Sequence, residues 1–92
     1  MPGTFQDNAA QSRYELDEGR GVSFAAYRDA GGLRALTHFE TPPSARGLGS
    51  AGRLMEAILD EARRTGRKLL ARCPYAVAWL ERYPEAGDVL VR

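Results

Sequence analysis

Residues 51–62 carry apolar side chains at helical spacing, and a strand-like segment lies on either side of them. The apolar positions share one face of the predicted helix: Ala51, Leu54, Met55, Ile58 and Ala62. The flanking segments, residues 33–40 and 67–72, each read as a strand. A strand, a helix and a second strand in this order need a crossover connection, so we expect the two strands to be parallel and the connection right-handed.

The residues before this unit predict an antiparallel meander. Residues 12–16 and 22–28 read as strands, and the alternation in the second places Val22, Phe24 and Ala26 on its buried face. The "DAGG" turn then leads into the strand at 33–40. A short helix is expected from Pro74 to about Tyr83, followed by a last short strand. The predicted fold class is therefore α/β, with a mixed sheet made of a meander and one parallel βαβ unit.

Length and composition set the class of protein. The 92 residues suffice for one domain, which we place at residues 12–92 behind a flexible lead-in at residues 1–11. A net charge of +1 gives no reason to expect nucleic acid or a membrane as partner, and no apolar run is long enough to span a bilayer. One cysteine and one histidine exclude an internal disulfide and the usual zinc clusters. We expect a cytoplasmic protein without a metal.

Three glycines precede or open the central helix: Gly47, Gly49 and Gly52. A helix start exposes unpaired backbone N–H groups, and glycines let an anion such as phosphate approach them. The first turn, residues 50–53, carries no acidic residue, and Arg46 and Arg53 add positive charge. The alternative is a flexible loop with Ser50 as the helix cap and no ligand. The spacing fits neither a nucleotide-binding P-loop nor a dinucleotide fingerprint.

The loop "RGLGSA" at residues 46–51 resembles the acyl-CoA pyrophosphate loop of the GNAT superfamily of acetyltransferases. "HFETP" at residues 38–42 and "CPY" at residues 73–75 are similar to motifs of its minimal single-domain branch. The chain differs from that branch at Phe39 and Thr41, where threonine and valine are usual. The similarity extends from about Ser12 to Leu90.

This resemblance implies that acetyl-CoA binds between the two parallel strands and donates its acetyl group to an amine of a small molecule or a protein. It implies that the pantetheine arm pairs with the backbone at Glu40 and Thr41. The pyrophosphate is then expected on the backbone N–H groups of Arg46, Gly47, Leu48, Gly49, Ser50 and Ala51.

Three side chains are candidates for the chemistry. His38 is the histidine of the chain and could accept a proton as a base, although a histidine between apolar neighbours is also common as a structural residue. Cys73 precedes a helix and could form a thiolate, or it could pack as a small apolar side chain. A Cys73–His38 pair would allow an acyl-enzyme route. In direct attack by the amine, Tyr75 or Cys73 would protonate the leaving thiolate, with Tyr83 a weaker candidate.

Other interpretations remain open at this point. Glu40 could act as a base through water or simply end a strand in solvent. The whole chain could be a catalytically weak module that binds acyl-CoA or a protein partner, or a structural domain in which the glycines serve only the turn.

Overall fold

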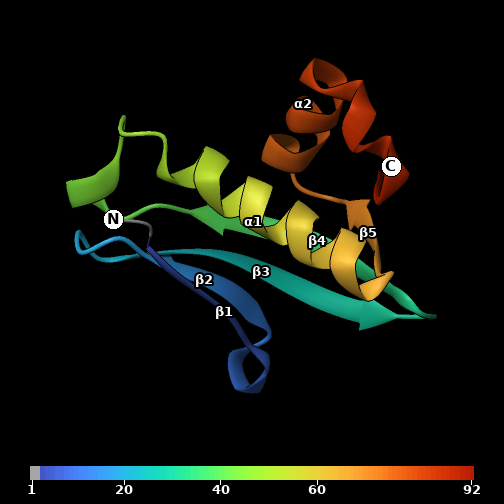
Figure 1. The fold of residues 1–92 in the computed structure, drawn as a ribbon, viewed down its shortest axis with the longest axis horizontal. Coiled ribbons are helices and arrows are strands. Elements are labelled where there is room, and N and C mark those ends of the chain that lie inside the picture. Colours follow the sequence, from blue (N-terminus) through green and yellow to red (C-terminus); the bar gives the residue numbers. More distant parts are fainter. Residues whose placement is uncertain (1–2) are drawn as a thin grey trace.

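The computed structural model describes residues 3–92 as a six-stranded sheet with two helices on one face (Figure 1). The strands follow one another across the sheet in the order β1-β2-β3-β4-β5-β6. β1 to β4 are antiparallel neighbours, whereas β4, β5 and β6 run parallel. The elements are β1 (Thr4–Asn8), β2 (Arg13–Asp17), β3 (Val22–Ala30), β4 (Leu33–Glu40), α1 (Ser50–Thr65), β5 (Lys68–Ala71), α2 (Pro74–Arg82) and β6 (Leu90–Val91).

The predicted fold class is confirmed, with one addition. β4, α1 and β5 form the expected parallel crossover, and β6 then pairs with β5 in parallel, so α2 belongs to a second crossover. Successive right-handed crossovers that advance in one direction place their helices on the same face of the sheet. Figure 1 shows both helices on that face. The other face of the sheet carries no helix in the described part of the chain.

The expected flexible lead-in is wrong for the residues that the structure describes. Residues 1–2 lie outside the described residues, but β1 pairs with β2, and a 3₁₀ turn (Ala9–Gln11) connects them. Phe5 stacks on Tyr14 with ring centroids 5.7 Å apart, which anchors this edge strand. Most contacts of β1 are polar, so its sequence does not alternate between apolar and polar residues. That alternation is the usual sequence signal of a strand.

The buried face of β3 also differs from the expected one. Ser23, Ala25 and Tyr27 are buried, whereas Val22 is exposed and Phe24 is half-buried. Pairing decides the face, because Ala25 lies opposite the buried Tyr14 of β2. Small residues fit there because helix α1 packs over this part of the sheet.

Both helices begin and end at the expected signals. α1 follows Gly49, and Gly66 ends it in the left-handed conformation at φ 74°, with its N–H donating to the Ala62 carbonyl. Leu54, Met55 and Ile58 are fully buried against the sheet, and they form one core with residues of β4, β5 and β6: Leu36, Leu69 and Leu90. α2 starts with Pro74 at its first position, and Pro84 follows its end. None of the helices in residues 3–92 is long and apolar enough to cross a membrane.

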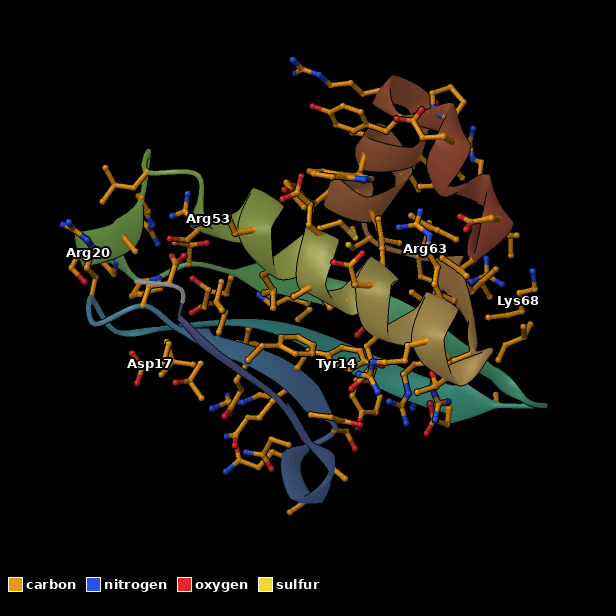
Figure 2. The ribbon with its side chains drawn as sticks, in the orientation of Figure 1. Tyr14, Asp17, Arg20, Arg53, Arg63 and Lys68 are labelled. Carbon is orange, nitrogen blue, oxygen red and sulfur yellow. The ribbon has the colours of Figure 1, made fainter. Side chains whose placement is uncertain are left out.

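A buried arginine links the two ends of the antiparallel half. The Arg34 guanidinium of β4 donates to the carboxylates of Asp29 and Asp7, at 2.7 Å and 3.1 Å, and to the Tyr14 hydroxyl at 3.0 Å. It also lies over the ring of Tyr27. The Tyr27 hydroxyl donates to Asp7, and burial together with this hydrogen bond raises the pKa of Tyr27 to about 12. Tyr14 lies between the sheet and α1 (Figure 2). This network holds β1 on the sheet.

Candidate functional site

The two central parallel strands separate toward their carboxyl ends. β4 pairs with β5 only from Leu33 to Leu36, and the last contact is the Arg72 N–H to the Leu36 carbonyl at 3.1 Å. The next residue, Thr37, is an extra residue in the β3–β4 ladder, because Leu36 lies opposite Tyr27 and His38 lies opposite Ala26. Beyond this bulge, residues 38–40 remain paired with β3 alone. The edge of β4 that faces away from β3 is therefore left without a neighbouring strand.

A cavity of about 390 Å³ opens where these strands diverge, and we call it the loop pocket. Its walls come from the end of β4, the loop before α1, the first turn of α1 and the start of α2. The lining residues are Thr41, Ala45, Arg46, Gly47, Gly49, Ser50, Ala51, Gly52 and Tyr75. The structure thus brings together most of the residues predicted to hold the cofactor. It also places Gly52, one of the three glycines noted at the helix start, in the lining, and it adds Ala45, for which no sequence feature was noted.

Two residues of the predicted cofactor set do not line the loop pocket. Leu48 lies at the tip of the loop with 46% of its surface exposed. Glu40 is exposed on β4, and its carboxylate contacts His38. The prediction for both residues concerns their backbone groups, so the position of their side chains does not test it.

The loop before α1 presents backbone donors to the pocket. Gly47 and Gly49 adopt positive φ angles of 78° and 82°, a conformation that turns the chain sharply and favours glycine. The first amide of α1 with a backbone partner is that of Arg53, which donates to Gly49. Among the described residues, the N–H groups of residues 50–52 have no hydrogen-bond partner, and no side chain caps the helix. A helix start of this kind can bind an anion through its free N–H groups and the positive end of the helix dipole.

The charge around the loop differs from the expectation in one respect. Arg46 lines the pocket, and its Nε donates to the Thr41 carbonyl at 3.2 Å. Arg53 instead contacts Glu18 of the β2–β3 turn, with Nε 2.5 Å from a carboxylate oxygen. The Ser50 hydroxyl donates to the same carboxylate at 2.7 Å. These hydrogen bonds lower the pKa of Glu18 to about 2, so Arg53 is neutralised and Arg46 provides the charge.

Tyr75 is the predicted catalytic residue that lies in the loop pocket. It is the second residue of α2, and its ring packs on Phe39 of β4 with centroids 4.8 Å apart. Its hydroxyl lies next to the first turn of α1, 4.0 Å from where a Cβ on Gly52 would be. Burial raises the pKa of Tyr75, and the neighbouring Tyr83, Cys73 and Glu56 raise it further. Tyr75 therefore carries its proton at neutral pH.

Cys73 lies in the core rather than in the loop pocket. It is 5% exposed, and its Sγ accepts the Ala76 N–H at 3.4 Å, so the thiol caps α2. The sequence predicted the position at the helix start correctly. Burial at this point limits the access of a thioester to the sulfur.

His38 lies on the opposite face of the sheet from Cys73. We expected His38 to share a face with Leu36, but the bulge at Thr37 reverses the alternation and points His38 away from the helices. Its ring packs on Phe24, and its Nε2 is 3.1 Å from a Glu40 carboxylate oxygen. The structure therefore does not bring His38 and Cys73 together. A two-residue alternation does not show where a bulge inserts an extra residue. The sequence pattern therefore predicts the wrong face of the sheet for His38.

Comparison with known proteins agrees with this geometry. Residues 13–89 match the family described as GCN5-related N-acetyl-transferase. The chain belongs to this family. Acetyl transfer is the reaction of GCN5-related N-acetyltransferases, and acetyl-CoA is generally their substrate.

The fold of this family member is also found in a solved structure. A GCN5-like protein from Staphylococcus aureus, solved by NMR, superimposes with a TM-score of 0.65. The match covers 95% of this chain and 86% of the other, at 21% sequence identity. At this identity the likeness concerns the fold. No curated protein sequence matches the chain significantly.

Proposed function

We propose that this chain binds acetyl-CoA in the loop pocket and transfers the acetyl group to an amine. The observation that carries the proposal is the row of unpaired N–H groups at residues 50–52, which lines a cavity beside the cationic Arg46. These groups offer the pyrophosphate both hydrogen bonds and the positive end of the helix dipole. The unpaired edge of β4 offers hydrogen bonds to the amides of the pantetheine arm near Glu40 and Thr41.

In the proposed reaction the amine nitrogen attacks the thioester carbonyl carbon, so that a C–N bond forms and the C–S bond breaks. The sulfur leaves as a thiolate, and Tyr75 donates the proton that converts it to the thiol. The proton lost by the amine returns to Tyr75 through solvent. A hydroxyl that keeps its proton at neutral pH suits this role.

Direct attack is favoured over an acyl-cysteine route. An acyl-cysteine needs a thiolate that reaches the thioester and a base beside it. Cys73 is buried, and His38 lies on the other face of the sheet. The alternative function, a module that binds acyl-CoA without turnover, would need the loop but no proton donor. Tyr75 in the wall of the pocket favours the enzyme.

Thermal unfolding with and without CoA tests the proposal. A ligand at a hundred times its dissociation constant stabilises the fold by about 2.7 kcal/mol, which raises the Tm of a domain of this size by roughly 10 °C or more. We expect Gly49→Asp to abolish this shift, because it adds a side chain and a negative charge to the loop whose N–H groups would bind phosphate; a Cβ at this position would lie 3.0 Å from an Arg53 nitrogen. Gly31→Asp is the matched control, since Gly31 also has a positive φ but lies in the β3–β4 turn away from the pocket. A wild-type Tm that does not change at millimolar CoA would refute the cofactor assignment.

A further inference from the structure

A second cavity adjoins the loop pocket along α1, and we call it the α1–α2 groove. It has a volume of about 280 Å³. Glu56 and Leu59 of α1 line one side, Trp79 of α2 and Tyr83 just after it line the other, and Glu85 also belongs to the lining. Trp79 also borders the first turn of α1, because a Cβ on Gly52, which lines the loop pocket, would lie 3.6 Å from its ring. The groove therefore runs from the proposed reaction site toward the end of α2.

The groove offers a cation two kinds of partner. Trp79 and Tyr83 pack on each other with ring centroids 4.6 Å apart, and each is only half-buried, so aromatic surface faces the groove. Aromatic faces attract ammonium groups. Among the described residues, no basic group lies within 4 Å of the carboxylates of Glu56 or Glu85. Both carboxylates are thus available to a positively charged ligand.

The one arginine in the wall of the groove does not fully offset this charge. Arg63 donates to the Asp88 carboxylate at 2.7 Å and 3.1 Å, and it lies 3.7 Å from Asp60. Its position beneath the end of the chain is visible in Figure 2. Arg63 also interacts with Glu85, but because it is shared with Asp60 and Asp88 it offsets only part of the charge, and the groove with its rim keeps a net negative charge.

We propose that the α1–α2 groove binds the charged tail of the acetyl acceptor, and that the acceptor is a small aliphatic diamine or polyamine. This inference rests on the proposed function. The amine that attacks the thioester must be neutral, so the carboxylates of the groove serve a second, protonated amine on the same molecule. Glu56 follows Gly52 of the loop pocket by one turn of α1, and the rings of Tyr75 and Trp79 have centroids 6.2 Å apart, so the groove begins beside the proposed proton donor. A cavity of 280 Å³ accommodates a short alkyl chain, whereas a protein segment would need a larger surface.

Trp79 is the only tryptophan of the chain, so its fluorescence reports on the groove directly. The experiment titrates the protein with 1,5-diaminopentane in the absence of CoA, and with 1,5-pentanediol as the uncharged probe of the same length. We expect the diamine to change the Trp79 emission saturably and the diol to have no effect. Glu56→Gln and Glu85→Gln should each weaken diamine binding about two- to five-fold, as expected for a partly exposed ion pair.

Glu81→Gln is the matched control, because Glu81 lies on α2 outside the groove and pairs with Arg92. Equal responses to diamine and diol, or equal affinities in the Glu56, Glu85 and Glu81 variants, would overturn the inference. Tighter binding of a blocked lysine peptide with the same dependence on Glu56 would also overturn it, in favour of a protein acceptor. In turnover, Glu56→Gln should raise KM for the diamine and leave KM for acetyl-CoA unchanged.

The titration separates this inference from the proposed function, because it contains no CoA. If the protein binds the diamine but not CoA, the α1–α2 groove is a cation site, and its proposed role in acceptor binding is overturned. CoA binding without diamine binding would overturn the groove alone.

Discussion

Glu18 and Arg53, 35 positions apart in the sequence, form an ion pair at the start of α1. The Arg53 Nε lies 2.5 Å from one carboxylate oxygen of Glu18, and the Arg53 Nη2 lies 3.0 Å from the other. The Ser50 hydroxyl donates to the same carboxylate. The Arg53 guanidinium is therefore paired with the β2–β3 turn; Figure 2 labels Arg53 at the start of α1. The pair fixes the first turn of α1, whose backbone forms the proposed phosphate site.

This pair predicts a pH dependence of stability. The pKa of Glu18 is lowered from 4.5 to about 2 by Arg53 and Ser50. A lowered carboxyl pKa means that the contribution to stability is complete above pH 4.5 and is lost as the pH falls toward 2. The free energy of unfolding of Glu18→Gln should therefore lie below that of the wild type at neutral pH, and the difference should shrink as the pH falls through this window. Urea unfolding at several pH values measures it. A difference that is as large at pH 2 as at pH 7 would contradict this account.

The Arg34 network predicts a large loss of stability on its removal. The Arg34→Met substitution leaves the Asp7 and Asp29 carboxylates and the Tyr14 hydroxyl without their common partner. Arg34 is buried, but Asp7 and Asp29 remain partly exposed to water, so we expect a loss of about 1.5–3 kcal/mol. Arg28→Met, an exposed change on the neighbouring strand, is the control and should cost little. Urea unfolding at neutral pH compares the two, and equal losses would mean that the buried network does not stabilise the fold.

Tyr75→Phe tests the proposed proton donor. The substitution keeps the ring that packs on Phe39 and removes only the hydroxyl. We expect kcat for acetyl transfer to fall about 10²-fold while the affinity for CoA stays within a few-fold of the wild type. Thr65→Val is the control, because it also removes one hydroxyl but lies at the far end of α1, outside the loop pocket and the α1–α2 groove. Equal rates for the Tyr75→Phe variant and the wild type would remove Tyr75 from the chemistry.

A catalytic pair of His38 and Cys73 is one of the two routes that the sequence leaves open, and the separation of the two residues makes a prediction of its own. Residues that lie on opposite faces of the sheet without a shared partner should have independent effects. The free-energy effects of His38→Ala and Cys73→Ala on kcat/KM should therefore add in the double variant. A double variant no worse than the more damaged single variant would show that the two act as a unit, and would restore the acyl-enzyme route.

Much of the fold follows from local patterns in the sequence. The apolar stripe of α1, the stop at Gly66 and the start of α2 at Pro74 each have a physical cause within a few residues, and the structure confirms them. The face of β3 and the side of His38 depend instead on strand pairing and on one extra residue at Thr37. β1 is held by polar contacts of Asp7 with residues 20 and 27 positions away. Such long-range contacts leave no periodic signal.

The candidate site divides in the same way. The loop could be predicted because glycines at positive φ and a helix start without an acid are local features. The neutralisation of Arg53 could not be predicted in this way, because Glu18 lies in a turn that is distant in the sequence. The α1–α2 groove needs two helices to be placed side by side, and neither helix alone indicates it.

An NMR titration of the isotope-labelled protein with acetyl-CoA tests the central claim most directly. Binding in the loop pocket should shift the amide signals of Gly47, Gly49 and residues 50–52 most strongly, because phosphate oxygens would accept hydrogen bonds from these groups. The signals of Gly31 and Gly32, in the turn at the other end of β4, should not move. Saturating acetyl-CoA that leaves the loop amides unshifted, or that shifts signals elsewhere in their place, would contradict the assignment of this pocket.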